Sequence, residues 1–131
     1  MKTLIVEDDF TSRLLLQTLL APYGECHVAV NGKEAVNAFS SASQGGDTYD
    51  LICMDIMMPE MDGQAALRKI RALEETAGIQ PPGGVKIIMV TAVSDTKSVF
   101  ASYQDLCDGY LFKPIETDKL VGYLKSFGLV P

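Results

Sequence analysis

Short apolar runs alternate with segments of helical periodicity along the whole 131-residue chain. The predicted strands are Leu4–Val6, Leu51–Met54, Val85–Val90 and Tyr110–Phe112, together with Cys26–Val30, whose alternation is typical of a half-exposed edge strand. A strand followed each time by a helix is typical of a parallel sheet whose two faces are covered by helices. We therefore predict an α/β sandwich in which five parallel strands alternate with five helices.

The five helices are predicted from apolar residues that recur three or four positions apart. The marker residues are Leu15, Leu19 and Leu20; Ala35, Val36 and Phe39; Ala66, Ile70 and Leu73; Val99, Tyr103 and Leu106; and Leu120, Leu124 and Phe127. Thr11 and Ser12 are candidate caps for the first helix. Serine, glycine and aspartate crowd residues 40–48, which predicts a loop there.

Chain length and charge restrict the domain count and the partner class. A chain of 131 residues suits a single domain over residues 1–131. The net charge is −6, and the sequence has no cluster of Lys and Arg with which to displace counterions from nucleic acid. We therefore expect no direct nucleic-acid binding and no binding to anionic membranes, whereas a metal cation would suit the acidic composition.

Cysteine usage and hydropathy point to the cytoplasm. The three cysteines Cys26, Cys53 and Cys107 are an odd number without close spacing, so they do not indicate a disulfide framework. The first apolar run meets Glu7 after three residues, which is unlike a signal peptide. No apolar run approaches the roughly 20 residues that a transmembrane helix needs.

Polar side chains follow four of the five predicted strands. Glu7, Asp8 and Asp9 come after the first strand, Asp55 after the third, Thr91 after the fourth and Lys113 after the fifth. Because parallel strands end at the same edge of a sheet, and ligands of such sheets bind beyond that edge, we expect these side chains to gather there.

This set of side chains suits phosphoryl chemistry supported by a metal. Two carboxylates about 4 Å apart repel by about 4 kcal/mol at an effective dielectric constant near 20, so a hard cation such as Mg²⁺ is the natural partner. Glu7, Asp8 and Asp55 bring three negative charges, which Mg²⁺ and Lys113 balance. A carboxylate can attack phosphorus, and an ammonium and a hydroxyl such as that of Thr91 can neutralise the phosphoryl oxygens.

The sequence resembles the receiver domain of two-component response regulators, the CheY-like family, over essentially its whole length. The motifs that carry the resemblance are Leu4–Asp9, Met54–Gly63, Val90–Ala92 and Gly109–Pro114, in this order and at these spacings. The resemblance implies a flavodoxin-like three-layer sandwich whose parallel strands lie in the order 2-1-3-4-5.

The resemblance also implies a role for each site residue. Asp55 would accept the phosphoryl group, and Asp8 and Asp55 would bind Mg²⁺ directly. The backbone carbonyl of Met57 would be a third protein ligand, and Glu7 would act through water.

Further roles implied by the resemblance concern the switch itself. Lys113 would pair with the phosphoryl oxygens, and Thr91 would bind the phosphoryl group and move on activation. Tyr110 would swing between exposed and buried positions. The bond between Lys113 and Pro114 would be cis.

For partners, the resemblance implies a sensor histidine kinase or a histidine phosphotransfer protein as the donor. A downstream effector protein would bind the surface of the fourth helix, fifth strand and fifth helix. The chain would be a monomer or a phosphorylation-dependent dimer, and a phosphoacceptor switch rather than an enzyme. Met57 and Val93 flank the expected path of the hydrolytic water and are apolar, which predicts slow self-dephosphorylation.

Two other functions remain open from the residues alone. A Mg²⁺-dependent phosphatase of the haloacid dehalogenase type forms an aspartyl-phosphate, but it carries an acid where this chain has Met57. A flavin or nucleotide carrier needs a phosphate cradle after the first strand, where Glu7, Asp8 and Asp9 would repel phosphate. Asp9 is also favoured as a helix cap, and Thr91 and Tyr110 also suit capping and packing roles.

Overall fold

The computed structural model describes residues 1–58, 60–79, 83–92 and 106–131, which form a five-stranded parallel sheet flanked by helices. The strand order is β2-β1-β3-β4-β5. The strands are β1 (Lys2–Val6), β2 (Glu25–Ala29), β3 (Leu51–Asp55), β4 (Lys86–Ala92) and β5 (Gly109–Lys113). The predicted sheet and its flavodoxin-like order are confirmed.

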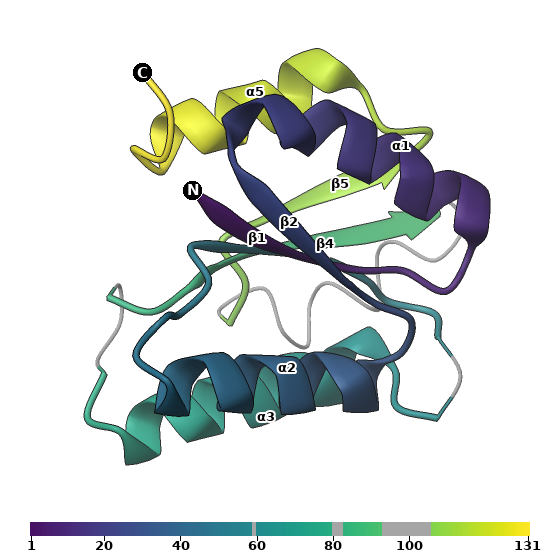
Figure 1. Cartoon of the computed structure of the whole chain (residues 1–131). Helices are drawn as coiled ribbons and strands as arrows, with labels where there is room; N and C mark the ends of the chain where they lie inside the picture. Colours follow the sequence, from purple (N-terminus) through teal and green to yellow (C-terminus); the bar gives the residue numbers. More distant parts are fainter. Residues whose placement is uncertain (59, 80–82, 93–105) are drawn as a thin grey trace.

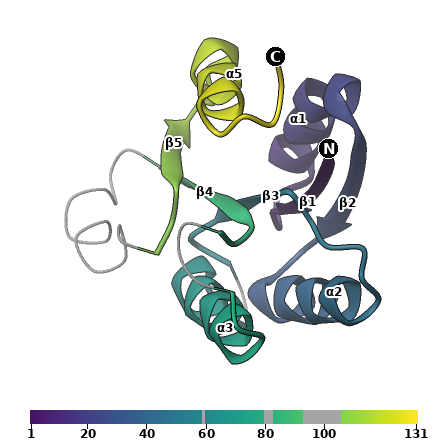
Figure 2. The same ribbon diagram turned by 90° about the vertical axis from the view of Figure 1, so that its left-hand side faces the viewer.

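Helices cover both faces of the sheet. Figure 1 shows α1 (Phe10–Leu20) and α5 (Thr117–Ser126) above the strands, and α2 (Gly32–Gln44) and α3 (Gly63–Thr76) below them. Figure 2, turned by 90°, shows the same three layers. A short 3-10 turn, η1 (Ala21–Tyr23), follows α1. The residues Val99 and Tyr103, on which the fourth predicted helix depends, lie outside the described part of the chain.

Each face of the sheet has its own apolar core. Leu4, Val6, Ile52 and Met54 point toward α2 and α3, whereas alternate residues such as Ile5 and Cys53 point toward α1 and α5. The alternation follows from the two-residue period of a strand. β1 and β3 therefore carry apolar residues facing both layers of helices. For this reason the sequence shows them as continuous apolar runs.

Some local predictions were confirmed and others were wrong. Of the three candidate caps of α1, the favoured Asp9 caps the helix and Thr11 and Ser12 do not, since the Asp9 carboxylate accepts a hydrogen bond from the Ser12 amide at 2.9 Å. The helix α2 extends to Gln44, so much of the predicted loop at residues 40–48 is helical. Its last turns pack Ala42 against the core, which outweighs the weak helix propensity of serine.

The buried stripes of two helices also differ from the prediction. Leu16 is buried in α1 and Leu67 in α3, whereas Leu15 and Leu73 are exposed. Where several leucines are consecutive or closely spaced, the sequence pattern predicts which of them face the core only to within about one residue.

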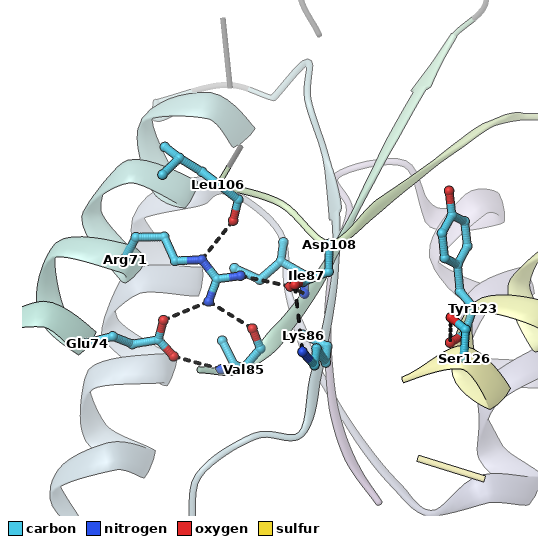
Figure 3. A network of polar contacts seen from close by, with 9 residues as sticks. All are labelled: Arg71, Glu74, Val85, Lys86, Ile87, Leu106, Asp108, Tyr123 and Ser126. Atoms are coloured by element: carbon cyan, nitrogen blue, oxygen red, sulfur yellow. Dashed lines mark hydrogen bonds and ion pairs between the residues drawn. The ribbon is translucent and has the colours of Figure 1, made fainter. Parts of the chain in front are cut away.

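At the edge of the sheet where β4 and β5 begin, Arg71 of α3 joins three segments (Figure 3). Its guanidinium donates to the carbonyls of Leu106 and Val85 at 2.8 Å each and pairs with Glu74 at 2.7 Å and Asp108 at 2.9 Å. Glu74 in turn accepts a hydrogen bond from the Val85 amide at 2.7 Å. These contacts tie α3 to the starts of β4 and β5.

None of the helices in the described ranges is both long and apolar enough to cross a lipid bilayer.

Candidate functional site

The register of the sheet brings the predicted site residues to one edge. Val6 pairs with Met54, so the chain leaves β1 at Glu7 beside the end of β3 at Asp55. Asp55 pairs in turn with Val90, next to Thr91, and Ala92 pairs with Lys113. The parallel order β1-β3-β4-β5 is therefore what gathers residues that are more than a hundred positions apart in sequence.

Three carboxylates meet at this edge. Glu7, Asp8 and Asp55 each offer an oxygen atom, and these three oxygens lie within 4.8 Å of one another. Glu7 is fully buried and Asp55 is 6% exposed, whereas Asp8 faces solvent. Such close carboxylates repel strongly because little water separates the two buried ones.

Lys113 partly balances this charge. Its Nζ lies 2.8 Å from Oε1 of Glu7 and 3.5 Å from Oδ2 of Asp55. Burial acts to lower the pKa of Lys113, but the contact with Glu7 and the charge of Asp55 outweigh burial, and the net pKa is raised. The ammonium therefore keeps its charge at neutral pH.

For the carboxyl group of Glu7, burial and the contact with Lys113 shift the pKa in the opposite directions to those seen for Lys113. Burial away from water raises the pKa of its carboxyl group, the contact with Lys113 opposes this shift, and the neighbouring Asp55 adds to it. The net shift is upward. One ammonium does not satisfy two buried carboxylates, so the site retains an excess of negative charge.

The turn between β1 and α1 holds two of the acids in place. The Glu7 amide donates to the carbonyl of Ala29 at 3.0 Å, which extends the sheet by one contact. The Asp9 amide donates to Oε2 of Glu7 at 3.2 Å, and Asp9 caps α1 as the sequence analysis favoured. Hydrogen bonds from Ser12 hold the pKa of Asp9 below its usual range.

The loop after β3 fits closely against the site because two glycines line it. A Cβ atom on Gly63 would lie 2.2 Å from the carbonyl oxygen of Asp55, and one on Gly32 would lie 2.3 Å from that of Met61. The Gly32 amide also donates to Met61 at 3.0 Å. Both contacts are with backbone, so a larger residue at either position would displace the loop.

The remaining predicted residues have different environments. Thr91 is buried, and its hydroxyl donates to the carbonyl of Ala92 at 3.3 Å. Tyr110 is 42% exposed, with its ring edge-on to Phe112 at a centroid distance of 5.7 Å. Met57 has an exposed side chain just after β3. The bond between Lys113 and Pro114 is cis, as predicted.

The donor set fits a hard divalent cation. Three carboxylate oxygens converge, one residue is open to solvent, and the only ammonium beside them in the described ranges is Lys113. Mg²⁺ prefers oxygen ligands and keeps several waters, which an open edge allows. Glu7, Asp8 and Asp55 are therefore the residues that would hold it.

Two features of the site were missed from sequence. The Lys113 ammonium lies closer to Glu7 than to Asp55, and Arg13 donates from Nη1 to the carbonyl of Glu7 at 3.0 Å. The position of Arg13, one helical turn after the cap Asp9, is a signal that points its side chain back toward this turn.

Comparisons with known proteins agree with this geometry. The sequence model of the response regulator receiver domain matches residues 3–125. The chain is 31% identical to histidine kinase 5 of Arabidopsis thaliana over 96% of its own length, and it spans 15% of that kinase's length.

Two solved structures share the fold. The first is the receiver domain of the histidine kinase CKI1 of Arabidopsis thaliana, complexed with Mg²⁺ and BeF₃⁻. It has a TM-score of 0.80 and 27% identity, over 97% of this chain and 89% of that one. The second is the receiver domain of the sensor histidine kinase PA1611 of Pseudomonas aeruginosa PAO1, with magnesium coordinated in its active site cleft. It has a TM-score of 0.75 and 28% identity, over 97% of both chains.

Proposed function

The chain belongs to the response regulator receiver domain family, and from this premise we propose that it accepts a phosphoryl group on Asp55. The observation that carries the proposal is the convergence of Glu7, Asp8 and Asp55 within 4.8 Å, with Lys113 in contact with two of them. A site that is rich in oxygen ligands and short of positive charge suits a cation and a phosphoryl group together.

Asp55 is the best placed nucleophile. It ends the central strand β3, is nearly buried, and lies beside both Asp8 and Lys113. One oxygen of its carboxylate attacks phosphorus while the bond from phosphorus to the donor nitrogen breaks, and the donor imidazole keeps the electron pair and takes up a proton. A phosphohistidine on a kinase or a phosphotransfer protein is the donor that the family membership supports.

Glu7, Asp8 and Asp55 would hold Mg²⁺, with the carbonyl of Met57 as a further ligand. When bound, the ion would supply positive charge for the phosphoryl oxygens. Lys113 would supply a second positive charge, and its contact with Glu7 keeps it within the site before phosphorylation. The Thr91 hydroxyl would donate to a phosphoryl oxygen after leaving its present contact with Ala92.

Phosphorylation would then change the β5–α5 side of the molecule. Thr91 pairs with Phe112 across β4 and β5, and Tyr110 lies two residues before Phe112 in the same strand. A shift of Thr91 toward the phosphoryl group would therefore change the surroundings of the Tyr110 side chain, which would move between exposed and buried positions. A downstream effector protein, or a second phosphorylated copy, would bind the changed surface.

A small phosphodonor tests phosphoryl acceptance directly. The protein is incubated with acetyl phosphate and Mg²⁺, and its intact mass is measured against an Asp55→Asn variant. We expect a phosphoryl adduct, of about 80 Da by the chemistry of the group, on the parent protein and none on the variant. An adduct of equal yield on Asp55→Asn would contradict the assignment.

The same incubation separates a switch from a phosphatase. A switch keeps its phosphoryl group long enough for the adduct to be isolated, and it releases little phosphate per chain. A phosphatase would release phosphate over many turnovers, and a general acid would be required two residues after the nucleophile. That position holds Met57, so we expect fewer turnovers than an enzyme would show.

The lifetime of the adduct follows from the same residue. Met57 has an exposed apolar side chain that cannot orient an attacking water. The Met57→Asn variant should therefore lose its phosphoryl group faster than the parent protein. Dephosphorylation is followed by intact mass after removal of the donor, and Leu73→Asn, an exposed apolar change on α3, serves as the control. Equal rates for the parent and Met57→Asn would contradict this part of the proposal.

A further inference from the structure

Arg13 stands out in the turn between β1 and α1 because it contacts the backbone of two acids. Its Nη1 donates to the carbonyl of Glu7 at 3.0 Å and lies 3.5 Å from the carbonyl of Asp8. Its guanidinium also lies over the ring of Phe10, with Cζ 5.6 Å from the ring centroid. The side chain is therefore held between its own helix and the turn.

These contacts satisfy backbone groups that the sheet and the helix leave open. At Glu7 the chain has left β1, and α1 begins only at Phe10. The Glu7 amide bonds to Ala29 and the Asp9 amide to the Glu7 side chain. Arg13 supplies the donor for the carbonyls, so the turn is held from both its amide side and its carbonyl side.

Arg13 differs from Lys113 in which oxygens it uses. Lys113 contacts the carboxylate oxygens of Glu7 and Asp55, which a metal would also use. Among the described residues, the side-chain hydrogen bonds of Arg13 go only to backbone carbonyls of the turn. It can therefore hold Glu7 and Asp8 in position without occupying their ligand atoms.

We propose that Arg13 is a positioning residue that holds the β1–α1 turn so that Glu7 and Asp8 face Asp55 before a divalent cation binds. The proposal rests on the proposed function, because it concerns the same acidic site. Without Arg13, repulsion between the three carboxylates would favour turn conformations in which their oxygens lie farther apart. Binding the cation would then require the turn to be reordered, which weakens affinity.

The positive charge of Arg13 and its hydrogen bonds have opposite effects on Mg²⁺ affinity. The direction in which the affinity changes on substitution therefore tests the proposal. A guanidinium near the site repels a divalent cation, so removing its charge alone would strengthen Mg²⁺ binding. Removing its hydrogen bonds would weaken binding. Arg13→Gln removes both the charge and the guanidinium fork, whereas Arg13→Lys keeps the charge and loses the fork.

Mg²⁺ affinity measured by isothermal titration calorimetry separates the two effects. We expect Arg13→Lys, which loses the fork and keeps the repelling charge, to weaken binding about tenfold, the lower end of what loss of an outer-shell contact costs, and Arg13→Gln, which also loses the repelling charge, to weaken it by a smaller factor. Arg68→Gln, an exposed position on α3 with the same charge change, should bind as the parent does. Unchanged or tighter binding by Arg13→Gln overturns the proposal.

Hydrogen exchange of the metal-free protein gives a readout that does not depend on the ion. The Asp9 amide, bonded to Glu7 in this turn, should exchange faster in Arg13→Gln and Arg13→Lys than in the parent, while amides in the middle of α1 keep their protection. Faster exchange throughout α1 would indicate a merely structural role and would overturn the proposal. Failure of the parent itself to bind Mg²⁺ would instead refute the cation site of the proposed function, and with it this inference.

Discussion

At the scale of single residues, the site is defined by an imbalance between buried acids and one ammonium. Lys113 contacts Glu7 at 2.8 Å and Asp55 at 3.5 Å, so its one charge faces two buried carboxylates. Loss of Lys113 would leave both carboxylates uncompensated in a poorly hydrated place, whereas loss of one acid would relieve repulsion. Each of these side chains is therefore under an electrostatic constraint that a surface ion pair would not impose.

A second residue under constraint is Thr3, in the middle of the buried strand β1. Its side chain is fully buried, and its hydroxyl has no hydrogen-bond partner among the described residues. An unmade hydrogen bond of this kind costs about 1–3 kcal/mol. We expect Thr3→Val, which keeps the shape, to raise the free energy of unfolding by about 1 kcal/mol.

Urea unfolding followed by circular dichroism measures this change. Thr18→Val is the matched control, because that hydroxyl is exposed and donates to the carbonyl of Leu14 at 2.9 Å. The control should shift stability by no more than about 0.5 kcal/mol. A lower stability of Thr3→Val would mean that the hydroxyl is satisfied in solution.

The buried thiol of Cys53 predicts how the free energy of unfolding changes with pH. Complete burial raises the pKa of its thiol from 9.0 to about 12. The folded state therefore holds the thiol proton between about pH 9 and pH 12 while the unfolded state releases it, so this group makes the protein less stable as pH rises through that window.

The reactivity of the thiols checks this environment. Cys26 and Cys107 are partly exposed and Cys53 is buried. With excess iodoacetamide at pH 8, the intact mass of the native protein should show at most two additions, and the third only in denaturant. The Cys53→Ala variant should show no third addition in denaturant. Rapid triple labelling of the native parent protein would show that Cys53 is accessible.

At the scale of secondary-structure elements, α3 serves as the anchor for the starts of β4 and β5. Arg71 and Glu74 lie one turn apart on α3 and reach Val85, Leu106 and Asp108. Asp108 also accepts a hydrogen bond from the Ile87 amide at 2.8 Å. The network in Figure 3 therefore fixes two strands to one helix through charged hydrogen bonds that are mostly shielded from solvent.

Removing Arg71 should be costly for this reason. We expect Arg71→Ala to lower the free energy of unfolding by about 3 kcal/mol, because it removes the guanidinium charge that pairs with two carboxylates and the donors to two carbonyls. Together with Asp108→Asn, the loss should be smaller than the sum of the single changes by about 1 kcal/mol, since the two residues share one contact.

Denaturant unfolding of the four proteins in this cycle gives both quantities. Arg68→Ala, three residues earlier on the exposed side of α3, should change stability by no more than about 0.5 kcal/mol. Strict additivity of Arg71→Ala and Asp108→Asn would contradict the coupling that the contacts indicate.

The elements also show what the sequence could and could not predict. Buried strands such as Leu51–Met54 are continuous apolar runs, and their ends place Asp55 and Lys113 at one edge without any knowledge of contacts. Helix ends were less readable, because the extent of α2 depends on packing of Ala42. The Arg71 network joins residues up to 37 positions apart, and no local pattern marks such a partner.

At the scale of the whole molecule, the two edges of the sheet differ in how completely their charges are paired. At the edge where the strands begin, Arg71 and Lys86 face Glu74 and Asp108. At the edge where they end, the described residues place three acids around Lys113. Among the described residues, the charges of the first group are paired, whereas the second group keeps an excess of negative charge that a bound cation would balance.

The sheet order also explains why the sequence predicted which residues form the site but not which of them contact one another. The order of a parallel sheet brings Glu7, Asp8, Asp55 and Lys113 together regardless of side-chain conformation. Which of the two buried carboxylates lies closer to the Lys113 ammonium is decided by side-chain positions that differ by less than an ångström. The preference of Lys113 for Glu7 therefore became visible only in three dimensions.

The most direct test of the central claim, that Glu7, Asp8 and Asp55 share one divalent cation, is the melting temperature as a function of Mg²⁺. At ten times the dissociation constant, Mg²⁺ should stabilise the protein by about 1.4 kcal/mol, which for a chain of this size is a rise of about 5 °C. Asp8→Ala should melt higher than the parent without metal, because one repulsion is gone, and should show no Mg²⁺ response. Glu75→Ala, an exposed acid on α3, should respond as the parent does. An equal Mg²⁺ shift in Asp8→Ala and in the parent would contradict the shared site.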